Sequence, residues 1–497
     1  MKNNFISYSI KKLGNGLKNI YSNKVVLMFL ILCIIGISTT GKPLSFTVSE
    51  VLTRFGRNTF LVLALIIPVL AGLGLNFGIV VGAMAAQIAI FFVIYWGFTG
   101  INGLTLSVVI CTPIAILFGF LVGCLYNKTK GAEMITGMVL AYFADGLYQL
   151  FFLFILGAII PINDTTLMIA GGIGVKNTID LTGNLKYSLD TVSMLLLFRI
   201  LLIMYFVFSV INVTLRKKKE SNSDNKLVIV KIGSTILLFL LTLIPVIRDF
   251  LGTDRLLLLD AITIGCVLAG LFAVTKICLI KFIQKHKDIE INRYIAIIIV
   301  AIIVYALTYI PVVYDITLSI SLPVCTYAAI ILICGFNRWI LNTKLGQNMR
   351  TVGQSRTVAN SAGINVNKTR IIAMCISTVL ASWGQLIYLQ NLGTFSTYGA
   401  HSMVGQYAIA ALLVGGASVR MANNKQAILG VILFHTLFVV APLSASHLFG
   451  SSLIGEYFRV FICYGVIALS LAMHAWKKVK KPDFKLFSLL PMLFLRK

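Results

Sequence analysis

Long apolar runs recur along the whole chain, and they restrict its fold more than any other feature of the sequence. Most extend over about 20 residues, the length that an α-helix needs to cross the hydrocarbon core of a bilayer. Apolar residues make up 58% of the chain and charged residues only 12%, whereas soluble domains average about 45–50% and about 25%. We therefore expect an all-α fold, that of a polytopic helical membrane protein.

The apolar runs divide into about fourteen predicted transmembrane helices. These helices cover residues 25–40, 58–74, 76–96, 104–125, 134–159, 191–213, 227–247, 256–279, 294–313, 317–340, 371–390, 405–419, 426–446 and 454–474. Because fourteen is an even number, both ends of the chain are expected on one side of the membrane.

Lysine and arginine are distributed unevenly between the two sets of connecting segments. Segments on the side of the N-terminus contain 30 of these residues, and segments on the other side contain 7. Cytoplasmic loops of membrane proteins have the excess of basic residues. We therefore expect a multi-pass protein of the plasma (inner) membrane with both termini in the cytoplasm. The same distribution explains the net charge of +26 without a nucleic acid as partner.

The longest polar passage of the C-terminal half is Leu345–Arg370, LGQNMRTVGQSRTVANSAGINVNKTR. Together with Lys344 it contains five basic residues and no acidic one. It is expected to face the cytoplasm and to form two short helices, Gly346–Val352 and Ser355–Ala362, with Gly363 as a C-cap. A basic loop facing anionic lipid would explain the arginines but not the ordered glycines. We predict that this segment docks another protein.

Two glycine-rich stretches interrupt the helical pattern. In Pro68–Ala86, glycines and Asn76 indicate either a broken helix or a closely packed helix pair. The polar turn Gln390–Gly405 precedes the short apolar segment Gln406–Ala417 and is expected to lead into a half-helix near the outer face. The longest outer loop, residues 160–190, is either a contact for an extracellular partner or a solvated surface loop.

Motifs for nucleotide binding and hydrolysis do not occur in the sequence, which lacks GxxxxGK[ST], HExxH and GxSxG. The nine cysteines include no CxxC pair, and the five histidines are scattered along the chain. We therefore expect no enzymatic activity, no metal site and no cofactor bound by this chain.

One group of polar side chains is predicted at membrane depth. Asp145 lies within a predicted span, and Tyr142 and Gln149 fall on the same helix face by their spacing. An ionisable side chain at the centre of a membrane helix costs about 2.5–3.5 kcal/mol on insertion scales, so its presence points to a function such as lining a polar cavity. In the alternative interpretation, a proton-coupled secondary transporter, Asp145 would be a proton relay. Glu456 and Arg459 are expected to pair on one helix face.

The polar segment resembles the coupling loop of inner-membrane permeases of ABC importers, of the ribose, branched-chain amino acid and nucleoside type. The similar positions are Gly346, Arg350–Gly353, Val358–Ala359 and Ala362–Ile364, and Thr351 stands where alanine is usual.

Three other stretches are similar to the same family. Tyr407–Gly416, YAIAALLVGG, resembles a segment of small apolar residues that ends in Gly-Gly. Gly131–Gly146, GAEMITGMVLAYFADG, resembles the nucleoside branch from Glu133 onward, with Ala141 in place of the usual asparagine. Leu75–Ala86 resembles an Asn-x-Gly stretch but lacks the acid-Gly-Gln motif that commonly follows it.

The resemblance implies that the chain is a permease subunit of an ATP-driven importer. It implies cytoplasmic ATPase partners that bind ATP and Mg²⁺, a second permease subunit that is identical or different, and an extracellular or periplasmic substrate-binding protein. Its cargo would be a small polar solute, a nucleoside or related ribosyl compound in preference to a sugar.

Arg350 and Arg356 would meet an acidic rim of the ATPase, and Val358 and neighbouring apolar residues would supply the apolar contact. The coupling residues would be Gly346, Arg350, Val352, Gly353, Arg356, Ala359, Gly363 and Ile364. The substrate path would include Asn76, Tyr142, Asp145, Gln149, Phe395 and Gln406.

Four parts of the chain are expected on this basis. They are an N-terminal permease half (1–190), inserted transmembrane helices (191–316), a C-terminal permease half with the coupling loop at 345–370 (317–475), and a basic cytoplasmic tail (476–497). The insertion has no counterpart in the usual ten-helix permease and is expected to be a peripheral supporting bundle. Its four helices, an even number, would leave the topology of both flanks unchanged.

Overall fold

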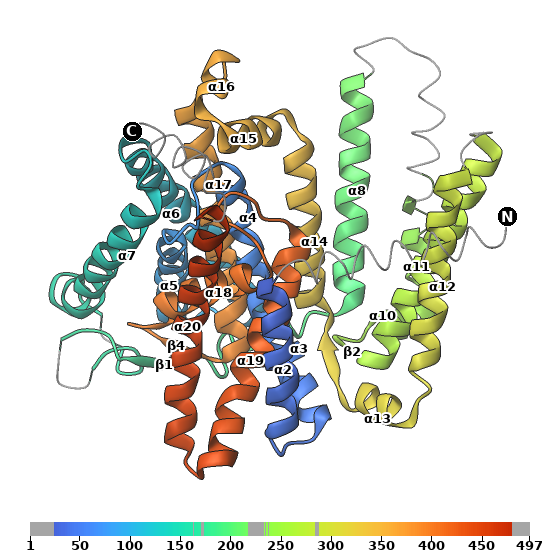
Figure 1. Cartoon of the computed structure of the whole chain (residues 1–497), viewed down its shortest axis with the longest axis horizontal. Helices are drawn as coiled ribbons and strands as arrows, with labels where there is room; N and C mark the ends of the chain where they lie inside the picture. Colours follow the sequence, from blue (N-terminus) through green and yellow to red (C-terminus); the bar gives the residue numbers. More distant parts are fainter. Residues whose placement is uncertain are drawn as a thin grey trace, which may run out of the picture.

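The computed structural model describes residues 24–162, 164–169, 173–216, 233, 235–236, 238–283 and 288–479, and its regular structure is almost entirely helical (Figure 1). The predicted all-α membrane fold is confirmed. The first group of helices comprises α2 (Lys24–Thr39), α3 (Leu44–Ala64), α4 (Ile66–Leu70), α5 (Ile79–Tyr95), α6 (Gly100–Lys128) and α7 (Glu133–Leu150), which continues as the π-helix η1 (Phe151–Ile159). The second group comprises α8 (Met194–Arg216), α10 (Pro245–Leu251), α11 (Leu258–Ile283), α12 (Asp288–Leu307) and α13 (Pro311–Ser319). The third group comprises α14 (Val324–Asn342), α15 (Lys344–Gln354), α16 (Arg356–Ser361), α17 (Val366–Leu392), α18 (Ala400–Val414), α19 (Asn424–Phe449) and α20 (Ser452–Val479).

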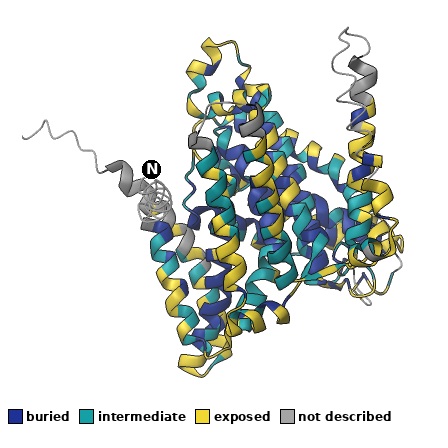
Figure 2. Cartoon of the chain, turned by 90° about the vertical axis from the view of Figure 1, so that its right-hand side faces the viewer, coloured by how far each residue is buried: buried dark blue, intermediate teal, exposed yellow. Residues whose placement is uncertain are grey.

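The first and third groups pack together into a main bundle. Helix α17 packs against α6, α5 and α3, so the two halves of the sequence interleave rather than form separate units. Helix α5 is apolar on every side and is buried along most of its length, as expected of a helix at the centre of a membrane protein. Figure 2 shows buried residues along the middle of the bundle and exposed residues on its outer surface.

The second group stands beside the main bundle (Figure 1). It is attached by a two-stranded antiparallel ribbon in which β2 (Arg255–Leu257) pairs with β3 (Ser321–Pro323). The backbone N–H of Met194 also donates to the carbonyl of Thr253, and that of Val324 to the carbonyl of Asp254. Both ends of the predicted insertion are therefore held at one place beside α14.

A second antiparallel ribbon holds the predicted outer loop against the bundle. Its strands are β1 (Thr178–Asp180) and β4 (Thr394–Ser396), with Ile179 opposite Phe395. Nearby, the buried carboxylate of Asp190 accepts hydrogen bonds from Gln390 Nε2 (3.2 Å) and Asn391 Nδ2 (3.0 Å). The loop is thus attached to the end of α17, which the sequence pattern did not predict.

Seven helices are long and apolar enough to cross a membrane among the residues that the structure describes, or eight if one bent pair forms a single span. The bent pair is α12 with α13, which meet at 88° because Pro311 starts a new helix. Three other apolar helices, α2, α5 and α18, are shorter than 18 residues, and only residues 194–207 of α8 were included in this test. Among the described residues the test therefore finds fewer full spans than the fourteen predicted. Some of the predicted helices are short or bent, and parts of others lie outside the residues searched.

Several predicted helix positions are corrected by the structure. The helix predicted at 58–74 begins at Leu44, so Arg54 and Arg57, expected in an outer loop, lie inside α3. The helix predicted at 317–340 begins at Val324, after the extended Pro323. Residues 227–232, 234 and 237 of the helix predicted at 227–247, and the tail 480–497, lie outside the described residues.

The predicted interruption at Pro68–Ala86 is a turn between α4 and α5. Gly72 and Gly74 both adopt φ of +73°, a left-handed conformation that favours glycine. Asn76 lies in this turn, is fully buried, and accepts a hydrogen bond from the Tyr126 hydroxyl (3.2 Å). The stretch is thus a break between helices.

Candidate functional site

The α15–α16 segment (residues 344–361) is an ordered structure at one end of the main bundle. Each helix begins with a side-chain N-cap, because Thr343 Oγ1 accepts from the N–H of Gly346 and Ser355 Oγ accepts from the N–H of Val358. Ser355 has an extended backbone (φ −155°) and separates the helices, and Gly363 follows α16 with φ +75°. The two predicted helices and the terminating glycine are confirmed.

Two glycines of the segment allow close backbone contact with the bundle. A Cβ atom at Gly353 would lie 2.1 Å from the carbonyl oxygen of Leu70, and one at Gly346 would lie 2.2 Å from the carbonyl oxygen of Ile340. No side chain fits at either position without movement of the backbone. Because these two glycines have no side chain, α15 can lie directly against the ends of α4 and α14.

The apolar residues of the segment face inward. Val352 and Ala359 are buried in a small cluster with Val366, and Ile364 packs against its side. The sequence predicted these residues as an apolar contact for another protein, and the structure instead places them where they join α15 to α16 and α17. Val358, which is 60% exposed, is the apolar side chain on the outer surface.

Seen from the side, α15 lies across the end of the bundle and α16 projects beyond it (Figure 1). Arg350, Thr357 and Val358 are exposed, as is Lys368 at the start of α17. The projecting surface therefore offers a cationic and partly apolar face, with the cap hydrogen bonds and the buried cluster fixing its shape.

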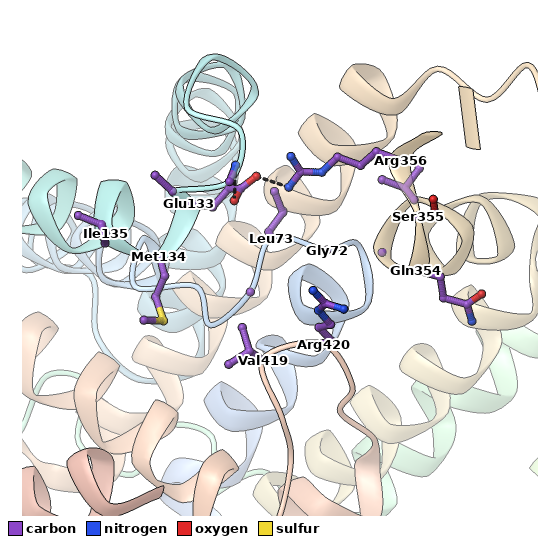
Figure 3. A pocket seen from close by; sticks show the side chains of 15 residues that line it. Gly72, Leu73, Glu133, Met134, Ile135, Gln354, Ser355, Arg356, Val419 and Arg420 are labelled. Carbon is purple, nitrogen blue, oxygen red and sulfur yellow. Dashed lines mark hydrogen bonds and ion pairs between the residues drawn. The ribbon is translucent and has the colours of Figure 1, made fainter. Parts of the chain in front are cut away.

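A cleft of about 480 Å³ separates this segment from the start of α7. Its lining comes from the α4–α5 turn, the first residues of α7, the α15–α16 junction and the α18–α19 loop, which supplies Val419 and Arg420. Figure 3 shows Arg356 reaching from α16 across this cleft to Glu133 at the start of α7. Four separate segments of the chain thus meet beside α16.

Glu133 joins three helices through one carboxylate. Its Oε1 atom accepts from Arg356 of α16 and from Nη2 of Arg370 of α17 (2.5 Å), and its Oε2 atom accepts from the N–H of Gly131 (3.0 Å). Arg370 is fully buried, and its Nε and Nη1 atoms have no hydrogen-bond partner among the described residues. The carboxylate is therefore the counter-charge for a guanidinium that solvent does not reach.

This ion-pair cluster changes the role expected for Arg356. The sequence placed Arg356 opposite an acidic rim of another protein, but in the structure its partner is Glu133 of the same chain. Glu133 appeared in the sequence only as part of a similar stretch, without a role. Since 223 residues separate it from Arg356, no local pattern could have joined the two.

A second polar group lies further along α7. Asp145 Oδ2 accepts from Gln149 Nε2 (3.1 Å), as expected from their spacing on one helix face. Asp145 Oδ1 lies 2.6 Å from His401 Nε2, and His401 Nδ1 lies 2.8 Å from Gln87 Oε1. The sequence missed His401 and Gln87, because isolated polar residues in apolar helices gave no spacing signal.

The other predicted path residues do not join this group. Tyr142 is 71% exposed on α7, and Phe395 is fully buried in β4 opposite Ile179. Gln406 is half-buried on α18, and Asn76 pairs with Tyr126 in the α4–α5 turn. Among the residues that the structure describes, no three His, Cys, Asp or Glu side chains are placed to hold a metal ion.

Comparison with known proteins gives one match. The model of a family described as "Branched-chain amino acid transport system / permease component" matches residues 227–471, which include α14 to α19 and the α15–α16 segment. The match starts inside the part of the chain predicted as an insertion. Neither the curated proteins nor the solved structures include one that matches the chain.

Proposed function

This chain belongs to the ABC importer permeases of the branched-chain amino acid and ribose type, and from that membership we propose that it couples to cytoplasmic ATPase subunits through the α15–α16 segment. The observation that supports the proposal most strongly is the projection of this ordered, basic, acid-free segment from the end of the bundle. A permease of this kind is a transport subunit, and the energy of ATP hydrolysis reaches it through contacts at its surface.

The proposed coupling depends on how α16 is attached. A partner that changes shape with its nucleotide can move the permease only if it contacts the permease differently in its two states. Arg350 and Val358 on the exposed face would provide these contacts. Arg356 would transmit a displacement of α16 to Glu133, and so to the start of α7.

The proposed assembly contains two permease subunits, identical or different, two ATPase subunits that hold ATP and Mg²⁺, and an extracellular or periplasmic substrate-binding protein. The α15–α16 segment would face the cytoplasm. The excess of lysine and arginine in the connecting segments on its side of the membrane supports this orientation, with both termini on the cytoplasmic side.

The proposed cargo is a small polar solute, a nucleoside or related ribosyl compound before a sugar. The similarity of Gly131–Gly146 to the nucleoside branch supports this order. The polar side chains of Asp145 and Gln149 on α7 support a path that accepts hydrogen-bonding groups.

Charge reversal on the projecting face tests the proposal. We expect Arg350→Glu to abolish both uptake and co-purification of the ATPase subunits, while the protein remains in the membrane. Arg248→Glu is the matched control, because Arg248 is an exposed arginine of α10 outside the main bundle. Normal uptake by the Arg350→Glu variant would contradict the proposed coupling.

The pairing of Asp145 with His401 favours one alternative, a proton-coupled secondary transporter, because both side chains can exchange protons. The two functions differ in their energy source. A carrier would lose uptake when a protonophore is added and would retain it without the ATPase subunits, and the ATP-driven importer would behave in the opposite way.

A further inference from the structure

A buried polar cluster lies beneath α7, where it meets α5 and α18. Gln87 belongs to α5, Asp145 and Tyr148 to α7, and His401 to α18. His401 is fully buried between the Gln87 amide and the Asp145 carboxylate, and its ring centroid lies 4.7 Å from that of Tyr148. Asp145 has 27% of its side chain exposed, so the cluster extends from the interior to the surface of the subunit.

Two atoms of this cluster are buried without a hydrogen-bond partner among the described residues, Gln87 Nε2 and the Tyr148 hydroxyl oxygen. Rotating the Gln87 amide by half a turn does not remove the deficit. It would turn Nε2 toward His401 and leave Oε1 unpartnered instead. Buried polar groups in folded proteins nearly always have partners. Orphaned atoms also occur elsewhere, as at Gln385, but these two lie beside His401, whose partner Asp145 reaches the surface, so a solute group can supply the missing partner.

Access to these atoms depends on α7. This helix packs lightly on α5 and α6 compared with the packing of α17, and only three of its 18 residues are buried. Its first residue, Glu133, is linked to α16. A modest displacement of α7 would therefore open the cluster without disturbing the centre of the bundle.

The charges of the cluster restrict what it can bind. If both ring nitrogens of His401 donate, its positive charge is balanced by Asp145. If the Gln87 amide is rotated, its Nε2 donates to His401 Nδ1, and the imidazole carries a proton only on Nε2 and is neutral. The ionised carboxylate of Asp145 then gives the cluster a net negative charge. Neither arrangement offers an unpaired positive charge to an anion. The unpartnered Gln87 Nε2 is a hydrogen-bond donor, which a cation cannot satisfy.

We propose that Gln87, Tyr148 and the Asp145–His401 pair form a binding site in the transport path for an uncharged solute group that both donates and accepts hydrogen bonds, such as a hydroxyl or an amide. The site rests on the proposed function, because it requires the chain to line a path. The unpartnered amide and phenol atoms take the solute group, and the Asp145–His401 pair orients the amide.

The test uses the complete importer, purified from its host membranes and reconstituted in liposomes. Uptake of radiolabelled uridine and ribose, both uncharged, is compared with uptake of uridine 5′-monophosphate. We expect uptake of an uncharged probe and none of the monophosphate. Gln87→Leu and Tyr148→Phe should each lower uptake about tenfold or more, because each removes a hydrogen bond to a buried group. ATP hydrolysis and the amount of assembled complex should remain at the wild-type level.

Gln385→Leu is the matched control. Gln385 is a fully buried glutamine of α17 whose amide atoms have no hydrogen-bond partner among the described residues, and the structure records no contact between it and His401. It should retain uptake. Tyr148→Phe removes a single oxygen atom, so it remains informative if Gln87→Leu fails to assemble.

Four results would overturn the proposed site: wild-type uptake by Tyr148→Phe, an equal loss in Gln385→Leu, preference for the monophosphate, or no uptake of either uncharged probe by a wild-type complex that hydrolyses ATP. Arg350→Glu separates this failure from failure of the proposed coupling. If Arg350→Glu abolishes uptake and Tyr148→Phe does not, only the binding site is wrong. If Arg350→Glu transports normally, the coupling role is wrong.

Discussion

At the scale of single residues, one carboxylate pairs with two guanidinium groups at the start of α7. Glu133 is 7% exposed and Arg370 is fully buried, so neither can replace its partner with water. By contrast, Glu456 and Arg459 form a pair (2.9 Å) on α20 with 60% and 30% of their side chains exposed. The contribution of a buried ion pair to stability can therefore be compared with that of an exposed ion pair in the same protein. The pairing predicted for Glu456 and Arg459 is confirmed.

We expect Glu133→Gln to lower the free energy of unfolding by about 3–5 kcal/mol, because it leaves Arg370 buried beside a neutral amide. Glu456→Gln should cost less than about 1 kcal/mol, since its pair is exposed. Thermal unfolding of the purified permease in detergent measures both. Equal losses for the two variants would show that Glu133 does not have the role given to it here.

Gly353 is a second residue whose role follows from its position. Gly353→Ala would bring a Cβ atom to 2.1 Å from the Leu70 carbonyl oxygen and so push α15 away from the end of α4. We expect uptake to be lost and α15 to become more accessible to protease. At Gly335 of α14 a Cβ atom meets nothing within 4 Å, so Gly335→Ala should be neutral or stabilise by about 0.5–1 kcal/mol. A Gly353→Ala protein with wild-type uptake would contradict the close contact.

At the scale of elements, α7 and α16 are linked although they are far apart in the sequence. Arg356 is 32% exposed and contacts the first residue of α7. Asp145 follows Glu133 by about 18 Å along the same helix, from a rise of about 1.5 Å per residue. Movement of α16 would thus reach the polar cluster through one helix.

Arg356→Gln tests this link. We expect faster amide hydrogen exchange in the first turns of α7, since Glu133 at its start loses one of its two arginine partners. Exchange in α15 should not change, because its N-cap and buried contacts remain. Hydrogen exchange with mass spectrometry, resolved to single peptides, measures the difference. Unchanged protection of the α7 amides would contradict the proposed link between α16 and α7.

The same elements show what the sequence could and could not predict. The α15–α16 helices followed from glycine positions and capping residues, which act within a few residues. The start of α3 was missed because Glu50, Arg54 and Arg57 interrupt the apolar pattern. In the structure Glu50 pairs with Arg54 within α3, and Arg57 donates to Asn391 (2.8 Å), which is 334 residues away.

The candidate site was predicted unevenly for the same reason. Asp145 and Gln149 were recognised because one helix places them together, whereas His401 and Gln87 reach Asp145 only through tertiary packing. Val352 and Ala359 were identified as part of the coupling segment but were predicted to face outward. Whether a small apolar residue in a short helix faces inward depends on what packs beneath it, here Val366 of α17.

At the scale of the whole molecule, the bundle combines a buried centre with the projecting α15–α16 segment and the lightly packed helix α7. Helices α5 and α17 are held by extensive burial, as required of a frame. The α15–α16 segment lies at one end of that frame, and α7 lies at its side (Figure 1). This arrangement allows a force applied at α16 to move α7 without unfolding the core.

The central claim is that an ATPase docks on the α15–α16 segment, and photo-crosslinking in intact cells tests it most directly. A photoreactive amino acid replaces Val358, which is 60% exposed on α16, or Val312 as a control, which is 64% exposed on α13. We predict that position 358 forms an adduct with a protein containing the GxxxxGK[ST] motif, in a yield that changes when ATP is depleted, and that position 312 does not. Absence of such an adduct from position 358, in cells that take up the cargo, would contradict the account.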